Sequence, residues 1–146
     1  MKVVSEPEKQ ALEQLQHYPR SHLVQAIKFS QNPRSVLPPR SSRIGQWYAF
    51  LSYAGKTLVK LPQQQRSSSA ATFWTESKRA RFRKQMLTAL QTPANVGYGH
   101  LDLYARNIAW NGHSFTLLDM GKLRKRPPQQ INVNHSLNIL VNHMNM

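Results

Sequence analysis

The chain has 146 residues, a formal net charge of +14 and no cysteine. Its length suits one domain with a modest core, and the absence of thiols excludes disulfides, thiolate metal sites and cysteine nucleophiles. The charge predicts attraction to polyanions, so an acidic protein, an anionic surface or a nucleic acid are the partner classes it suggests.

The chain shows no signal for a membrane span or a cleaved leader. No run approaches the roughly 18 apolar residues of a spanning helix, and the first residues lack the apolar stretch of a signal peptide. We therefore expect a cytoplasmic protein without a transmembrane segment, and export by a route without a cleaved signal is the alternative.

A first helix is predicted to begin after Ser5. Ser5-Glu-Pro-Glu8 is a capping-box pattern, in which the serine hydroxyl accepts the amide hydrogen of the third residue beyond it. The helix should continue through Leu12 and Leu15 and end before Pro19, because proline disfavours a helical residue before it.

The next part of the chain is expected to contain a β-hairpin. Residues 21–29 suit a short helix or a strand equally, and residues 31–43 form a loop with three prolines. Residues 47–61 comprise two β-prone segments on either side of the turn residues 54–56, which predicts that they pair as a hairpin.

A polar linker and a long helix follow. Residues 62–71 have the low complexity of a linker, and Phe82, Met86 and Leu90 repeat at helical spacing within 73–90. The opposite face is basic, either as a solvated face or as a polyanion patch, and it carries Lys78, Arg79, Arg81, Arg83 and Lys84. A second apolar helical stripe occupies 136–144.

The most informative stretch lies between Gly99 and Arg124, because it holds both aspartates of the chain, Asp102 and Asp119. Two apolar segments on either side of Asn111-Gly112 predict a hairpin, since this dipeptide tolerates positive φ at both positions. Such a hairpin would return Asp119 to the end where Asn107 lies, and one cation could bind both oxygen ligands there.

This stretch resembles the catalytic and metal-binding loops of the protein-kinase-like superfamily. His100-Leu-Asp102-Leu-x-x-x-Asn107 is similar to H-R-D-L-x-x-x-N, and Asp119-Met-Gly121 is similar to D-F-G. The resemblance implies a reduced kinase-like α+β fold in a single domain, 1–146. Its small N-terminal part (1–61) would contain the hairpin, and its truncated C-terminal part (72–146) would contain the helix, the catalytic loop and the metal-binding hairpin.

The resemblance also implies site roles, with ATP and Mg²⁺ as cofactors and a protein or sugar hydroxyl as acceptor. Asp102 would accept or orient the hydroxyl proton, and Asn107 and Asp119 would hold Mg²⁺. Lys60 resembles the lysine of V-A-I-K, which contacts nucleotide phosphates. Arg106 would either neutralise charge on the transferred group or brace the loop.

Other expectations stay open beside this interpretation. The helix 73–90 is expected to lead into the catalytic loop, and a pairing of its Glu76 with Lys60 is the alternative. The sequence lacks a glycine-rich loop before Lys60, has Leu101 in place of the arginine of H-R-D and has no activation segment after Gly121.

These departures keep two other functions in view. One is a kinase-like binding protein without catalysis. The other is a nucleic-acid-binding module that uses the basic helix, with Trp47, Trp74 and Trp110 as stacking platforms for bases.

Overall fold

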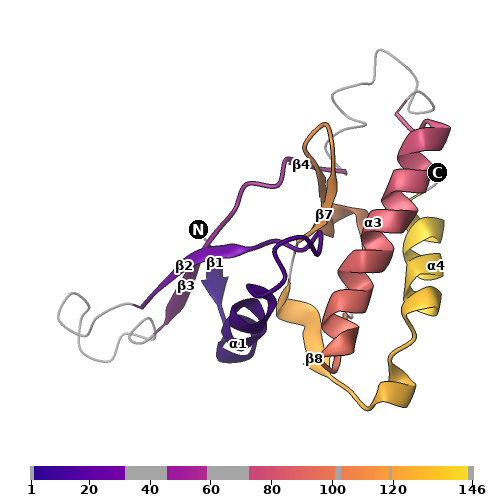
Figure 1. The fold of residues 1–146 in the computed structure, drawn as a ribbon. Helices are drawn as coiled ribbons and strands as arrows, with labels where there is room; N and C mark the ends of the chain where they lie inside the picture. Colours follow the sequence, from indigo (N-terminus) through magenta and orange to yellow (C-terminus); the bar gives the residue numbers. More distant parts are fainter. Residues whose placement is uncertain (1, 32–45, 59–72, 101–102, 119, 145–146) are drawn as a thin grey trace.

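The structure, a computed structural model, describes residues 2–31, 46–58, 73–100, 103–118 and 120–144. These residues form an α+β fold with three α-helices and three small sheets of antiparallel strands (Figure 1). In these ranges, no helix combines the length and the apolar character that a bilayer crossing requires. The predicted linker 62–71 lies outside the described residues.

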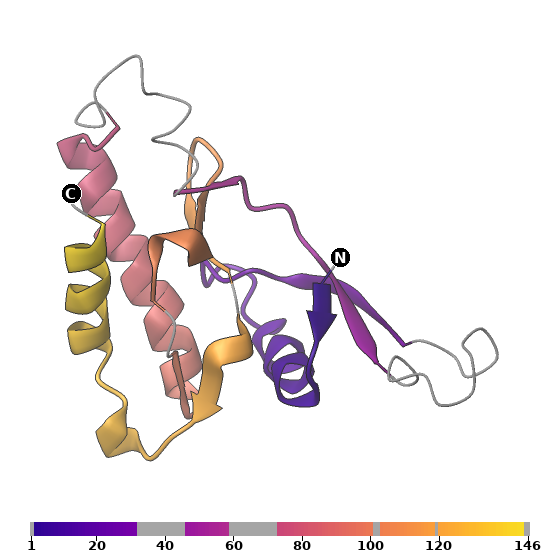
Figure 2. The ribbon, with the colours of Figure 1, turned by 180° about the vertical axis from the view of Figure 1, so that it is seen from behind.

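The first sheet has the strand order β1-β3-β2. Its strands are β1 (Lys2–Val4), β3 (Trp47–Leu51) and β2 (Ala26–Gln31). Helix α1 (Glu6–Leu15) follows β1 and packs its apolar side against the sheet (Figure 2). The segment 21–29, left open by its sequence, thus contributes a strand, while residues 32–45, most of the predicted loop, lie outside the described residues.

The predicted start of the first helix is confirmed. The Ser5 hydroxyl accepts a hydrogen bond from the Glu8 amide at 3.3 Å, as the capping-box pattern requires. The helix buries Ala11, Leu12 and Leu15, and its first turn is acidic, which the helix dipole favours.

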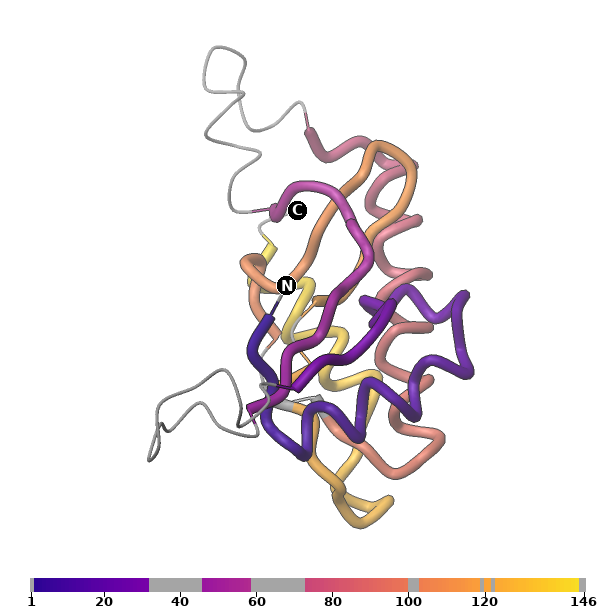
Figure 3. Tube along the Cα trace, turned by 90° about the vertical axis from the view of Figure 1, so that its left-hand side faces the viewer, coloured from indigo at the N-terminus to yellow at the C-terminus, as the bar shows by residue number. Residues whose placement is uncertain are grey.

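The predicted hairpin over 47–61 is wrong. Strand β3 already has a partner on each side, β1 and β2, so neither edge is left for the following segment. Strand β4 (Lys56–Thr57) instead pairs with β6 (Ile108–Trp110), and Figures 1 and 3 show the chain after β3 running from the first sheet to the second. The sequence indicated strand-forming residues correctly but not their partner, which is distant in the chain.

Helices α3 (Glu76–Asn95) and α4 (Val133–His143) pack side by side on the other side of the molecule (Figures 1 and 2). The spacing of Phe82 and Met86 is confirmed, since both side chains are fully buried. Helix α3 runs past its expected end because Pro93, in its last turn, is itself buried in the core.

The predicted hairpin around Asn111-Gly112 is confirmed as β6 and β7 (Phe115–Leu117). The Asn111 side-chain oxygen accepts the amides of His113 and Ser114, each at 2.8 Å, which closes the loop. Rings of Trp74 and Trp110 contact Phe115, so these two tryptophans help to hold the hairpin against α3.

The remaining elements are a two-stranded sheet and three short turns. Strand β5 (Tyr98–His100) pairs with β8 (Leu123–Lys125) as a separate two-stranded sheet. Three short 3₁₀ turns complete the described fold: η3 (Ala105–Asn107), η4 (Met120–Lys122) and η5 (Pro128–Gln130).

Candidate nucleotide and metal site

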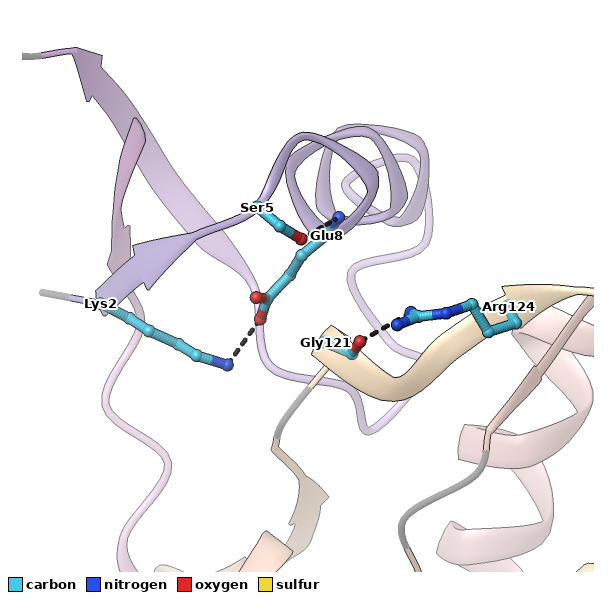
Figure 4. Close-up of polar contacts among 5 residues, drawn as sticks. All are labelled: Lys2, Ser5, Glu8, Gly121 and Arg124. Carbon is cyan, nitrogen blue, oxygen red and sulfur yellow. Dashed lines mark hydrogen bonds and ion pairs between the residues drawn. The ribbon is translucent and has the colours of Figure 1, made fainter. Parts of the chain in front are cut away.

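An ion pair joins β1 to α1 at one end of the candidate site. The Lys2 ammonium lies 2.5 Å from the Glu8 carboxylate, and only 7% of the Glu8 side chain is exposed (Figure 4). A buried carboxylate is costly unless it is paired. Lys2 and Glu8 are therefore held in fixed positions, with the ammonium on the more exposed side.

This ion pair lies on the wall of a cavity of about 460 Å³. The lining also includes residues 52–55, which we call the connecting segment because they join β3 to β4. The other lining residues are apolar: Leu12, Val24, Leu51, Leu118 and Met120. A cavity of this volume, apolar with a charged end, has the size and character of small-molecule sites.

The connecting segment offers backbone polar groups to the cavity. The Ser52 amide donates to the Gln25 carbonyl at 2.8 Å, which anchors the start of the segment beside β2. The backbone groups of the next two residues, Tyr53 and Ala54, form no hydrogen bond within the described part of the chain. Both residues line the cavity.

Asn107 lies at the base of the β6–β7 hairpin. Its side chain is almost fully buried, and its backbone carbonyl accepts the Leu118 amide at 2.7 Å. Leu118 also lines the cavity, and Asp119 follows it directly in the sequence. Asp119 itself lies outside the described residues, so its convergence with Asn107 stays a prediction that the Leu118 bond supports.

The turn η4 is packed firmly beside the cavity. Met120 is 1% exposed, and η4 contacts α1. The Arg124 guanidinium donates to the Gly121 carbonyl at 2.7 Å, a bond drawn in Figure 4 near the Lys2–Glu8 ion pair. The chain on the C-terminal side of Asp119 is thus held by both apolar packing and a charge-assisted hydrogen bond.

The catalytic-loop region follows α3, as the sequence predicts for this helix. Asn95 ends α3, and β5 begins three residues later at Tyr98. Asp102 lies outside the described residues, so its role as catalytic base stays a prediction. Arg106 is exposed and lies over the Tyr104 ring, with 4.5 Å between the guanidinium carbon and the ring centroid.

The structure places Glu8, and not Glu76, beside a lysine. Glu76 is exposed at the start of α3 and forms no ion pair with any residue that the structure describes. Its alternative pairing with Lys60 stays a prediction, because Lys60 is not among these residues. Lys60 lies outside the described residues, and its assignment to the phosphates stays a prediction. Lys2 is a second candidate for that role.

Sequence reasoning missed Lys2 and Glu8, although a signal was present. Lys2 precedes two valines, which favour a strand, and Glu8 follows within the first turn of a capped helix. In protein kinases, the lysine that contacts the nucleotide phosphates lies on a strand and forms an ion pair with a glutamate on a helix. The lysine was overlooked because β1 has only three residues.

The chemistry of two described residues suits a nucleotide with a divalent cation. Asn107 would offer an amide oxygen, which is a hard ligand of the kind Mg²⁺ prefers, and Lys2 would offer an ammonium suited to phosphate oxygens. No described group of three or more histidine or acidic side chains forms a metal site by itself, so a cation here would also need oxygen atoms from phosphates or from the aspartates.

Comparisons with known proteins support the fold alone. No protein-family model matches the chain, and no curated protein matches it. Among solved structures it is similar to one described as the structure of vaccinia related kinase 3, with a TM-score of 0.53 and 16% sequence identity. The alignment covers 85% of this chain and 35% of that one, so this chain spans about a third of its length. The chain has a reduced kinase-like α+β fold.

Proposed function

We propose that this chain, which has a kinase-like fold, is an ATP- and Mg²⁺-dependent phosphotransferase. It would move the γ-phosphoryl group of ATP to a hydroxyl of a protein or a sugar. The observation that carries the proposal is the Lys2–Glu8 ion pair at the charged end of a cavity of about 460 Å³. A strand lysine fixed by a helix glutamate is required for phosphoryl transfer in protein kinases.

The cavity suits a nucleotide along its length. The base would lie between the apolar walls, with its polar edge against the backbone groups of Tyr53 and Ala54. The phosphates would lie toward Lys2, whose ammonium is oriented by Glu8. Because Leu118 and Met120 both line the cavity, Asp119, the residue between them in the sequence, would lie close to the reacting phosphate.

Asn107 and Asp119 are the proposed metal ligands, and Asp102 is the proposed base. Mg²⁺, when bound, supplies positive charge that neutralises the phosphate oxygens during transfer. Asn107 is suited to this role by its burial and by the backbone bond that joins it to Leu118. Asp102 would orient the acceptor hydroxyl and take its proton, and Arg106 would stabilise negative charge on the transferred group.

The wider setting follows from the same proposal. The region 1–146 would act as one kinase-like unit in the cytoplasm, where ATP is abundant. The net charge of +14 favours an acceptor that belongs to an acidic protein or lies at an anionic surface.

The proposal is tested by the change Asp102→Ala. We expect the wild-type chain to form ADP from Mg·ATP with a suitable acceptor, and the variant to bind the nucleotide normally but turn over at least about 100-fold more slowly, since a positioned base contributes that much. ADP formation measured by a coupled assay gives the rate, and calorimetry gives the affinity.

Two outcomes count against this account. Equal turnover by wild type and Asp102→Ala would remove Asp102 from catalysis. Tight nucleotide binding by the wild type without turnover on any acceptor would favour a kinase-like binding protein.

A further inference from the structure

A second cavity, of about 440 Å³, lies between α3 and the segment that leads to β2. Its lining combines apolar surface with several nitrogen-bearing side chains. The residues are His22, Ala80, Arg81, Lys84, Gln85 and Thr88. None of them lines the cavity that holds Lys2 and Glu8, so the two cavities are separate.

The cavity is built by hydrogen bonds to the β6–β7 hairpin from two directions. From α3, Arg81 donates to the His113 carbonyl at 3.1 Å, and Gln85 accepts the Phe115 amide at 2.7 Å. From the other direction, the His22 carbonyl accepts the Leu117 amide at 2.8 Å. His22 and one face of α3 are therefore held in place on the same hairpin.

These bonds leave an excess of hydrogen-bond donors in the cavity. The side-chain oxygen of Gln85 is occupied by Phe115, so its NH₂ group remains. Arg81 uses one N–H, and the Lys84 ammonium forms no bond to any described residue. The Thr88 hydroxyl donates to the Lys84 carbonyl at 3.2 Å, so the remaining donors have no acceptor within the described part of the chain.

The described residues that line this cavity carry no negative charge. The glutamates of the chain lie on α1 or at the start of α3, and none of them lines this cavity. His22 has φ of 59°, which is unique among the described non-glycine residues. Such a conformation is strained for a residue with a side chain, and this histidine lines the same cavity as Arg81 and Lys84.

We propose that this cavity binds a phosphoryl anion through Arg81, Lys84, Gln85 and His22, and we call it the anion cavity. An arginine fork and a neighbouring ammonium are suited to the several oxygens of a phosphate, whereas a carboxylate has only two. The anion could be a soluble phosphate compound or a lipid headgroup, because both present the same group. This site is independent of the proposed phosphotransferase activity.

The test is calorimetric titration of the full chain with inorganic pyrophosphate at constant ionic strength. The double variant Arg81→Gln with Lys84→Gln should weaken binding at least about tenfold, because the loss of one charged hydrogen bond to a ligand lowers the affinity by about that factor. The matched control is Arg79→Gln with Arg83→Gln, which removes the same charge from residues of α3 that do not line the cavity. The control should bind as the wild type does.

A third variant distinguishes binding at a specific site from non-specific electrostatic attraction and from an effect of misfolding. His22→Asn removes the imidazole while keeping a residue that tolerates positive φ, and it should also weaken binding with an unchanged melting temperature. An equal loss in both double variants, or equal competition by acetate at matched ionic strength, would overturn the proposal, because either result indicates non-specific attraction.

Vesicle sedimentation distinguishes the two sources of the anion. Binding of the wild type, but not of Arg81→Gln with Lys84→Gln, to vesicles containing phosphatidic acid would identify a lipid headgroup. Binding of pyrophosphate without binding to such vesicles would identify a soluble phosphate compound. Failure of both probes would contradict the anion cavity and leave the nucleotide site unaffected.

Discussion

At the residue scale, the Glu8 carboxylate needs a partner because it is nearly buried, and the Lys2 ammonium supplies one. The pair contrasts with Lys9 and Glu13, which lie one turn apart on the same helix, because there the carboxylate side chain is 45% exposed. Exposed pairs of that kind contribute little. In the proposed function, the Lys2 ammonium would also contact the nucleotide phosphates.

The role of Lys2 predicts a specific loss of affinity. Lys2→Met should weaken binding of a non-hydrolysable ATP analogue with Mg²⁺ by about tenfold or more, because a charged hydrogen bond to phosphate is lost. Lys60→Met tests the other candidate lysine under the same conditions. Calorimetry measures both affinities, and a large loss in Lys60→Met with none in Lys2→Met would return the role to Lys60.

Residue assignments could be predicted from the sequence only where the pattern is local. The turn signal Asn111-Gly112 predicts a hairpin with Asn107 at its base. The hydrogen bond between the Leu118 amide and the Asn107 carbonyl agrees with that prediction. Lys2 has no comparable local signal, because a three-residue strand becomes recognisable only through its pairing with β3, more than forty residues away in the chain.

At the element scale, Gly55 fixes the direction of the chain between β3 and β4. Its φ is 106°, and a Cβ atom at this position would lie 2.2 Å from the Trp110 carbonyl oxygen. Only glycine permits both the conformation and this close approach. Gly55 thus allows β4 to pair with β6 and places the connecting segment along the cavity.

The change Gly55→Ala should therefore be strongly destabilising. We expect a loss of about 2 to 4 kcal/mol, which combines backbone strain with a backbone clash. Gly112→Ala is the matched control, since its φ is also positive, at 99°, but no atom lies within 4 Å of the added Cβ. Urea unfolding measures both, and equal losses would show that the approach to Trp110 is unimportant.

Helices were more predictable than strand pairing. The start of α1, the buried stripe of α3 and the stripe of α4 follow from capping and from a repeat of about 3.6 residues, which are properties of adjacent turns. The partner of a strand is decided by tertiary packing, which local sequence does not reveal. The sequence therefore predicts that the segment around Thr57 pairs with β3, whereas in the structure it pairs with β6.

At the scale of the whole molecule, the first sheet and the hairpin are joined directly. The Val24 amide donates to the Leu117 carbonyl, and the Leu117 amide donates to the His22 carbonyl, so the segment before β2 is bonded along β7. This connection joins the parts of the chain that supply Lys2 and Glu8 and that supply Leu118 and Met120 to the lining of the cavity of about 460 Å³. The two halves of the proposed site depend on it.

The central claim is that this cavity binds ATP together with Mg²⁺, and thermal melting tests it most directly. At a nucleotide concentration about 100 times Kd, binding stabilises the chain by about 2.7 kcal/mol, which should raise Tm by about 5 to 10 °C. ATP without Mg²⁺ should give a smaller rise, and Asp119→Ala should lose the effect of Mg²⁺. An unchanged Tm of the wild-type chain at saturating Mg·ATP would contradict the account.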